Sequence, residues 1–151
     1  MSETAVSDSA CLIAMDRIGR LELLQKSFKR VLIPPSVQRE FGRTIDWLSV
    51  LQIKNNAVVA ALKTQIGEGE SEAIALAMEI EGSIIILDDK KARRIAKQLG
   101  LNVIGTIGLL LRAKKKLLIS EIKPLLGELQ TAGFRISSEL YQEALKQGKE
   151  S

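Results

Sequence analysis

Short apolar runs alternate with longer segments of helical periodicity along the chain. Buried strands are predicted at residues 4–6, 31–33, 83–87 and 102–104, and a weaker alternating pattern at 47–53 suggests a fifth. Helices are predicted over residues 10–24 (broken near Gly19), 35–41, 57–62, 70–80, 89–99, 106–116, 120–132 and 137–147. This alternation predicts an α/β fold, a three-layer α/β/α sandwich around a mainly parallel sheet.

The length of 151 residues fits one compact domain spanning residues 1–151, and no linker or repeat divides it. Residues 148–151 are expected to fray. Apolar residues make up 46% of the chain but aromatic residues only 3%, so the core must consist of Leu, Ile, Val and Ala.

Several kinds of chemistry are excluded by composition. The chain has no histidine, which removes Ser–His catalysis and histidine metal sites, and the single Cys11 cannot form an internal disulfide. No apolar run approaches the roughly 20 residues of a membrane span, and residues 1–4 lack the basic start of a signal peptide. We therefore expect a cytoplasmic protein with no membrane partner.

Basic residues are concentrated in one segment. Residues 90–116 contain nine Lys or Arg and no acid, whereas the rest of the chain has a net charge of −5. This asymmetry suggests a side that faces a polyanion. The simpler alternative is a solvated helix face.

Acidic residues follow two of the predicted strands. Asp8 follows the first, and Asp88 and Asp89 follow the most apolar one. Ligands of parallel sheets bind beyond the carboxyl ends of strands, so these carboxylates would converge if the two strands are neighbours. The alternative is that Asp8 and Asp89 only cap helices.

Two glutamates extend this set. Helical periodicity puts Glu70 at the start of the apolar stripe of helix 70–80, where a buried acid needs a partner such as a cation. Glu40 borders the apolar side of its own helix, although it can equally be a surface residue. Together these acids would form an all-oxygen site, which suits magnesium or manganese.

Five segments, in this order, resemble a PIN domain of the VapC-like prokaryotic branch. They are VSDSACLIA (6–14), LIPPSVQREF (32–41), GEGESEAIALA (67–77), IILDDKKARR (85–94) and GLNVIGTIGLLLRAKKK (100–116). The resemblance covers residues from about 5 to about 145. It implies a PIN-like sandwich with a metal-dependent ribonuclease site of three or four clustered acids.

The resemblance also implies roles for individual residues. The catalytic acids would be Asp8, Glu40, Glu70 and Asp89, and the metal ligands would come from Asp8, Glu70, Asp88 and Asp89, with Asp89 favoured over Asp88. Ser9 could hydrogen-bond a ligand carboxylate or a water. The sequence departs from the family pattern at Glu70, where many relatives have Asp, and at Leu117, where this branch often has Gly.

The expected function is that of a magnesium- or manganese-dependent endoribonuclease, the toxin of a toxin–antitoxin pair. The resemblance implies an antitoxin partner and a homodimer, and the apolar residues 109–111 hint at an uncovered helix face. The candidates for contacts to the RNA backbone are Ser9, Arg93, Arg94, Arg112, Lys114 and Lys115. The alternative is a catalytically silent nucleic-acid-binding module. A phosphoacceptor domain and a nucleotide-binding domain fit the acid and glycine positions poorly.

Overall fold

The computed structural model describes residues 3–151; Met1 and Ser2, on which part of the domain and signal-peptide predictions rests, lie outside it. No helix within these described residues is long and apolar enough to cross a membrane. The elements are β1 (Thr4–Ser7), α1 (Ser9–Arg17), α2 (Glu22–Ser27), β2 (Arg30–Ile33), α3 (Pro35–Phe41), β3 (Leu48–Val50), α4 (Asn56–Leu62), α5 (Glu68–Met78), β4 (Ile84–Ile86), α6 (Lys90–Gln98), β5 (Asn102–Ile104), α7 (Thr106–Lys115), α8 (Lys123–Thr131) and α9 (Ser138–Gln147).

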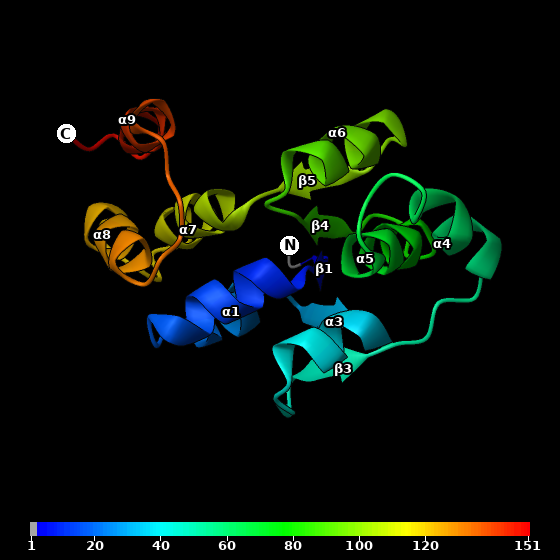
Figure 1. The fold of residues 1–151 in the computed structure, drawn as a ribbon. Coiled ribbons are helices and arrows are strands. Elements are labelled where there is room, and N and C mark those ends of the chain that lie inside the picture. The colour runs from blue at the N-terminus through cyan, green and yellow to red at the C-terminus, as the bar shows by residue number, and fades with distance from the viewer. Residues whose placement is uncertain (1–2) are drawn as a thin grey trace.

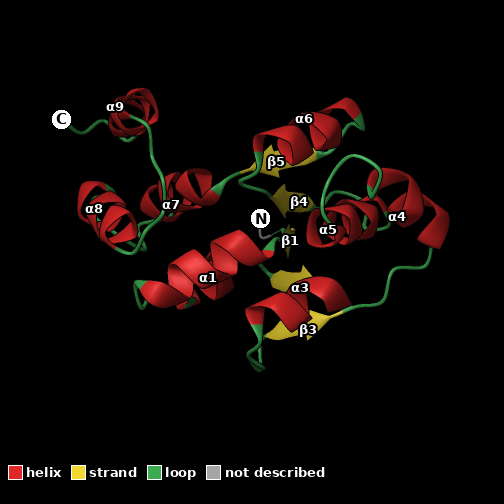
Figure 2. Cartoon of the chain, viewed as in Figure 1, coloured by secondary structure: helices red, strands yellow, loops and turns green. Residues whose placement is uncertain are grey.

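All strand pairs in the central sheet are parallel, in the order β3-β2-β1-β4-β5. Helices cover both faces of the sheet, as Figures 1 and 2 show. This arrangement confirms the predicted α/β/α sandwich. It also makes β1 and β4 direct neighbours, with Ser7 opposite Ile86, so Asp8 and Asp88 leave the same edge of the sheet.

Alternate residues of each strand serve two separate cores. Ala5 and Ile86 pack against α1, α2 and the α7–α9 region, whereas Val6 and Ile85 pack against α4, α5 and α6. The central strands are buried on both faces, which explains their continuous apolar sequence. The rigid layer between the two cores fixes where the strands end.

Some boundaries differ from the sequence prediction. The break expected near Gly19 is confirmed, since residues 10–24 divide into α1 and α2 and Gly19 has a left-handed φ of 70°, although α2 continues to Ser27. The alternating stretch 47–53 contains only the three-residue strand β3, and α8 begins at Lys123 rather than at residue 120.

The C-terminal residues, which we expected to fray, are held by Glu150. Its carboxylate accepts hydrogen bonds from Lys114 Nζ (2.7 Å) and from the backbone N–H groups of Ile122 (2.8 Å) and Lys123 (3.1 Å) at the start of α8. Burial alone would raise the pKa of Glu150, but these donors outweigh it and hold the pKa below its ordinary value. The end of the chain is therefore attached to α7 and α8.

Leu117 has a left-handed backbone conformation, with φ of 64°, and its side chain is 89% exposed. This conformation costs a branched residue roughly 1 kcal/mol or more but is free for glycine. The backbone thus provides a physical reason why glycine suits this position.

Candidate active site

Asp8 is a buried acid at the edge where the strands end, which we call the carboxyl edge. Its side chain caps α1, with Oδ1 accepting from the Cys11 N–H at 2.9 Å. Its Oδ2 accepts from the backbone N–H of Asp88 at 3.0 Å. Only 4% of Asp8 is exposed. One carboxylate therefore joins the ends of β1 and β4.

The electrostatic environment of Asp8 disfavours its negative charge. Burial, then the carboxylate of Asp88, and more weakly that of Glu70, raise the pKa of Asp8 from 3.8 to about 7, although the Cys11 and Asp88 N–H groups oppose the rise. Burial and the same two aspartates raise the pKa of the Cys11 thiol. Such a site is a candidate for function because a cation would relieve the repulsion.

Asp88 and Asp89 point in different directions. Both oxygens of Asp88 are held by Thr106, Oδ1 by the backbone N–H at 2.8 Å and Oδ2 by the hydroxyl at 2.6 Å. Asp89, the acid favoured by the family pattern, is exposed and caps α6 by accepting from the Ala92 N–H at 2.9 Å. The charge of Asp88 therefore acts on Asp8. Asp89 instead caps α6, as the helix-cap alternative for this residue predicted.

Glu70 and Glu40 come to this edge from neighbouring helices. Glu70 lies in the first turn of α5, is partly buried, and folds back so that a Cβ on Gly67 would lie 2.6 Å from its Oε1. Glu40 lies at the exposed end of α3 and accepts a hydrogen bond from the Ser9 hydroxyl, while its Oε1 is 3.7 Å from a Cβ built on Gly69. The four positions Asp8, Ser9, Glu40 and Glu70 thus surround one region.

The donor chemistry of this region fits a divalent cation, because all the donors are oxygens and, within residues 3–151, neither the buried Asp8 nor the partly buried Asp88 forms an ion pair. Across residues 3–151, however, no three His, Cys, Asp or Glu side chains converge closely enough to hold a metal ion. The inner part of the site is the pair Asp8 and Asp88, with Glu70 and Glu40 farther out.

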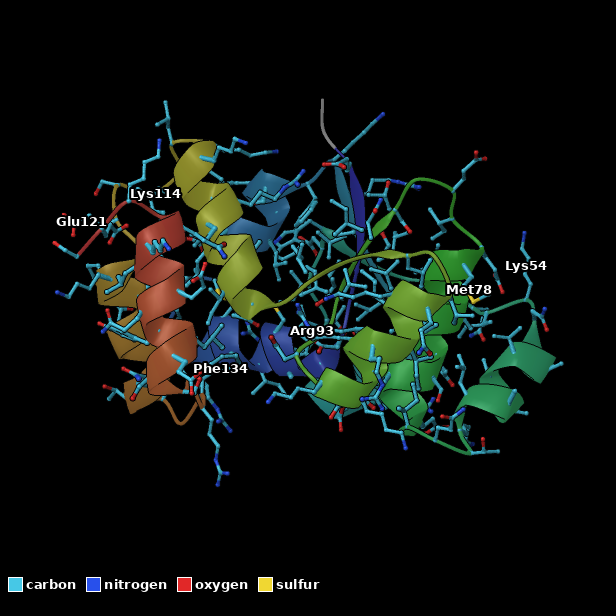
Figure 3. All side chains as sticks on the ribbon, turned by 90° about the horizontal axis from the view of Figure 1, so that it is seen from above. Lys54, Met78, Arg93, Lys114, Glu121 and Phe134 are labelled. Atoms are coloured by element: carbon cyan, nitrogen blue, oxygen red, sulfur yellow. The ribbon has the colours of Figure 1, made fainter. Side chains whose placement is uncertain are left out.

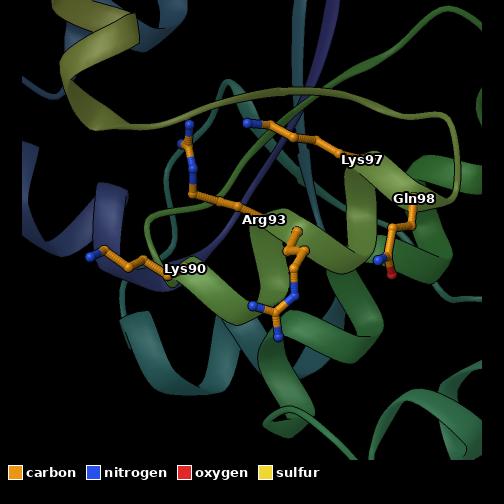
Figure 4. Close-up of a pocket in the computed structure, with 5 residues that line it drawn as sticks. Lys90, Arg93, Lys97 and Gln98 are labelled. Carbon is orange, nitrogen blue, oxygen red and sulfur yellow. The ribbon is translucent and has the colours of Figure 1, made fainter.

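Basic side chains of α6 lie next to these acids. An open hollow of about 430 Å³ is lined by Lys90, Arg93, Arg94, Lys97 and Gln98. Arg93 and Lys97 extend toward the segment between α6 and α7 (Figure 4). Arg93 also donates to the Leu87 carbonyl at 2.9 Å, so this cation lies at the end of β4, one residue before Asp88. This hollow is suited to a phosphate chain.

The basic residues of α7 lie elsewhere. Arg112 pairs with Glu3, which precedes β1, and stacks on the Phe28 ring at 4.6 Å. Since Asp8 follows β1, Arg112 is at the opposite edge of the sheet, about 16 Å away by the rise of an extended strand. Lys114 pairs with Glu150, and Figure 3 shows it beside α9, away from Arg93. Lys115 is exposed on the same last turn. The structure does not bring these three residues to the acids.

A family model described as PIN domain matches residues 4–150. The chain belongs to the PIN domain family. PIN domains are generally nucleases and typically use divalent metal ions, so the chain has a nuclease-type fold. The VapC-like branch is compatible with this match and stays a prediction. A search of curated proteins finds no match.

Thr106 is the site residue of this PIN domain that sequence reasoning missed. It is fully buried and begins α7, immediately after the carboxyl end of β5. The rule that identified Asp8 and Asp88 also applies here, because Thr106 follows a strand that neighbours β4. A hydroxyl carries no charge, so a search for acids did not find it.

The raised pKa of Asp8 predicts an inverted pH dependence for the stability of the metal-free protein. Between pH 3.8 and about 7 the folded state retains a proton that the unfolded chain has lost, so stability falls as pH rises through this window. Asp8→Asn removes this effect. Relative to wild type, the variant should gain about 2 kcal/mol between pH 5 and pH 8.

The measurement is chemical denaturation of both proteins in EDTA at the two pH values. The variant also loses one hydrogen-bond acceptor, but that loss is the same at both pH values and cancels in the comparison. A stability difference that does not change with pH would contradict the electrostatic description of Asp8.

Proposed function

We propose that this PIN domain is a metal-dependent endoribonuclease whose inner acids are Asp8 and Asp88. The observation that carries the proposal is the burial of Asp8 against the end of β4, where Asp88 and Glu70 add unfavourable negative charge. Enzymes use adjacent carboxylates of this kind where a cation and a phosphate meet. Of the two aspartates in the predicted ligand set, the proposal takes Asp88 rather than the favoured Asp89, because the charge of Asp88 is the one that acts on Asp8.

The position of each site residue suggests a separate role in the proposed reaction. Asp8, Asp88 and Glu70 would hold magnesium or manganese, while Glu40 and Ser9, which bond to each other, form the outer rim. When bound, the ion supplies Lewis-acid activation of water and neutralises charge that develops on the scissile phosphate. Asp8 is fixed by two backbone donors and therefore keeps its orientation as substrate approaches.

The basic side chains of α6 favour RNA as the proposed substrate. Lys90, Arg93, Arg94 and Lys97 recur at helical spacing along one hollow, and Arg93 connects that hollow to the end of β4. Contacts of this kind bind phosphate groups but do not distinguish one base sequence from another. The α6 segment contains no aromatic residue on which a base could stack.

The toxin role, the antitoxin partner and the homodimer rest on the resemblance to the VapC-like branch. The apolar residues 109–111 do not support a homodimer, because Leu109 and Leu110 are fully buried within the protomer. We keep the antitoxin and the homodimer as proposals on the family resemblance alone.

The second candidate function is a nucleic-acid-binding module without catalysis. One observation favours it: within the described residues, no three potential ligands converge on a single point. The α6 hollow would serve either function, so cleavage and binding have to be measured separately.

A pair of adjacent substitutions tests the ribonuclease. Asp88→Asn should abolish magnesium- or manganese-dependent cleavage of a mixed RNA pool, because it removes half of the inner pair. Asp89→Asn is the matched control and should retain activity within a few-fold, since asparagine caps helices as well as aspartate does. Wild-type protein with EDTA gives the background.

Loss of cleavage with Asp89→Asn but not with Asp88→Asn would reverse the assignment. If wild-type protein binds RNA but does not cleave the pool with either ion, the binding module becomes the better description.

Matched lysines test the α6 hollow. In the Asp88→Asn background, Lys97→Gln should weaken binding of a single-stranded RNA oligonucleotide several-fold and reduce the slope of log K against log salt by about 0.7. Lys115→Gln removes the same charge from the last turn of α7, outside the α6 hollow, and should have little effect. Filter binding over a salt series measures both. Equal losses for the two variants would show that the net charge, and not the hollow, binds RNA.

A further inference from the structure

Asp88 and Thr106 occupy equivalent positions on neighbouring strands. Ile86 of β4 pairs with Ile104 of β5, and Asp88 and Thr106 each follow two residues later. The Leu87 N–H continues the pairing by donating to the Ile104 carbonyl at 2.9 Å. The register of the sheet therefore sets the carboxylate of Asp88 against the first turn of α7.

Thr106 holds both oxygens of this carboxylate. Its N–H donates to Oδ1 at 2.8 Å and its hydroxyl donates to Oδ2 at 2.6 Å, and Thr106 itself has no exposed surface. Each carboxylate oxygen has about two lone pairs. The two hydrogen bonds from Thr106 use one lone pair on each oxygen and leave the other available to a cation. A short, charge-assisted bond from a buried donor fixes the plane of the carboxylate.

Close packing at Gly105, the residue before Thr106, also restricts Asp88. A Cβ on Gly105 would lie 3.0 Å from Oδ1 of Asp88 and 2.7 Å from Nη1 of Arg93. Both distances are shorter than ordinary carbon contacts. The absence of a side chain at Gly105 thus lets the carboxylate and the guanidinium approach the β5–α7 turn.

We propose that Thr106 is a positioning residue for Asp88, and that its hydroxyl sets the affinity of the site for a divalent cation. The inference rests on the proposed function, because it takes Asp88 as a ligand. Loss of a group that orients a ligand typically weakens metal binding by about 10–100-fold. Thr106 itself touches neither the cation nor the RNA.

Calorimetric titration with manganese alone tests this role. Thr106→Val keeps the shape and the backbone N–H but removes the hydroxyl, and it should weaken manganese binding about tenfold. Thr106→Ser restores the hydroxyl and should bind within about twofold of wild type. Gly105→Ala places a methyl group against Oδ1 of the same carboxylate and should also weaken binding. Circular dichroism and melting curves confirm that each variant is folded.

The outcomes separate this inference from the function on which it rests. Weak binding by the valine variant with rescue by serine supports the positioning role. If wild type binds manganese and Thr106→Val binds equally well, Thr106 is only structural and the proposed function stands. If wild type does not bind manganese, the metal site fails and the positioning role is overturned with it.

Discussion

The buried contact between the Asp8 carboxylate and the end of β4 is the constraint from which the candidate site follows. Because β1 and β4 are neighbours in a parallel sheet, their carboxyl ends bring the buried Asp8 and the partly buried Asp88 together at one edge. The charge of Asp8 is costly there, as its raised pKa shows. Two neighbouring carboxylates do not help the fold to be stable, whereas a cation-binding site requires them.

The remaining elements are arranged around this pair according to the two faces of the sheet. The start of α5 brings Glu70 from one face, and α3 brings Glu40 toward Ser9 at the start of α1. Glu72 accepts from the Ser36 N–H at 3.0 Å and so joins α5 to α3. Thr106 at the start of α7 borders Asp88 from the opposite face, whereas Arg93 of α6 borders it from the same face as α5. Each contributing group comes from a helix that begins or passes close to this edge.

Most of the fold was predictable from the sequence because its signals are local. Continuous apolar runs identified the central strands, and the helices predicted over 35–41 and 57–62 match α3 (Pro35–Phe41) and α4 (Asn56–Leu62) to within one residue. Three-dimensional pairing was not predictable. The choice between Asp88 and Asp89 depends on which carboxylate meets Thr106, eighteen residues later, and no spacing within the segment 85–94 contains that information.

The cations of α7 illustrate the same limit. Residues 90–116 form one basic segment in sequence, but the fold divides it between α6 and α7, which pack on opposite faces of the sheet. Arg112 and Lys114 are then used by Glu3 and Glu150 for internal ion pairs. The charge run suggested a polyanion-facing side, and the proposed function assigns that side to α6 because Arg112 and Lys114 already form internal ion pairs.

The central claim is that Asp8 and Asp88 together form a cation site. Anomalous diffraction from a manganese-soaked crystal tests it most directly. We predict a peak within coordination distance of carboxylate oxygens of both Asp8 and Asp88, with Asp89 still bonded to the Ala92 N–H. A peak on Asp89 without Asp88, or no peak at the carboxyl edge at saturating manganese, would contradict the account.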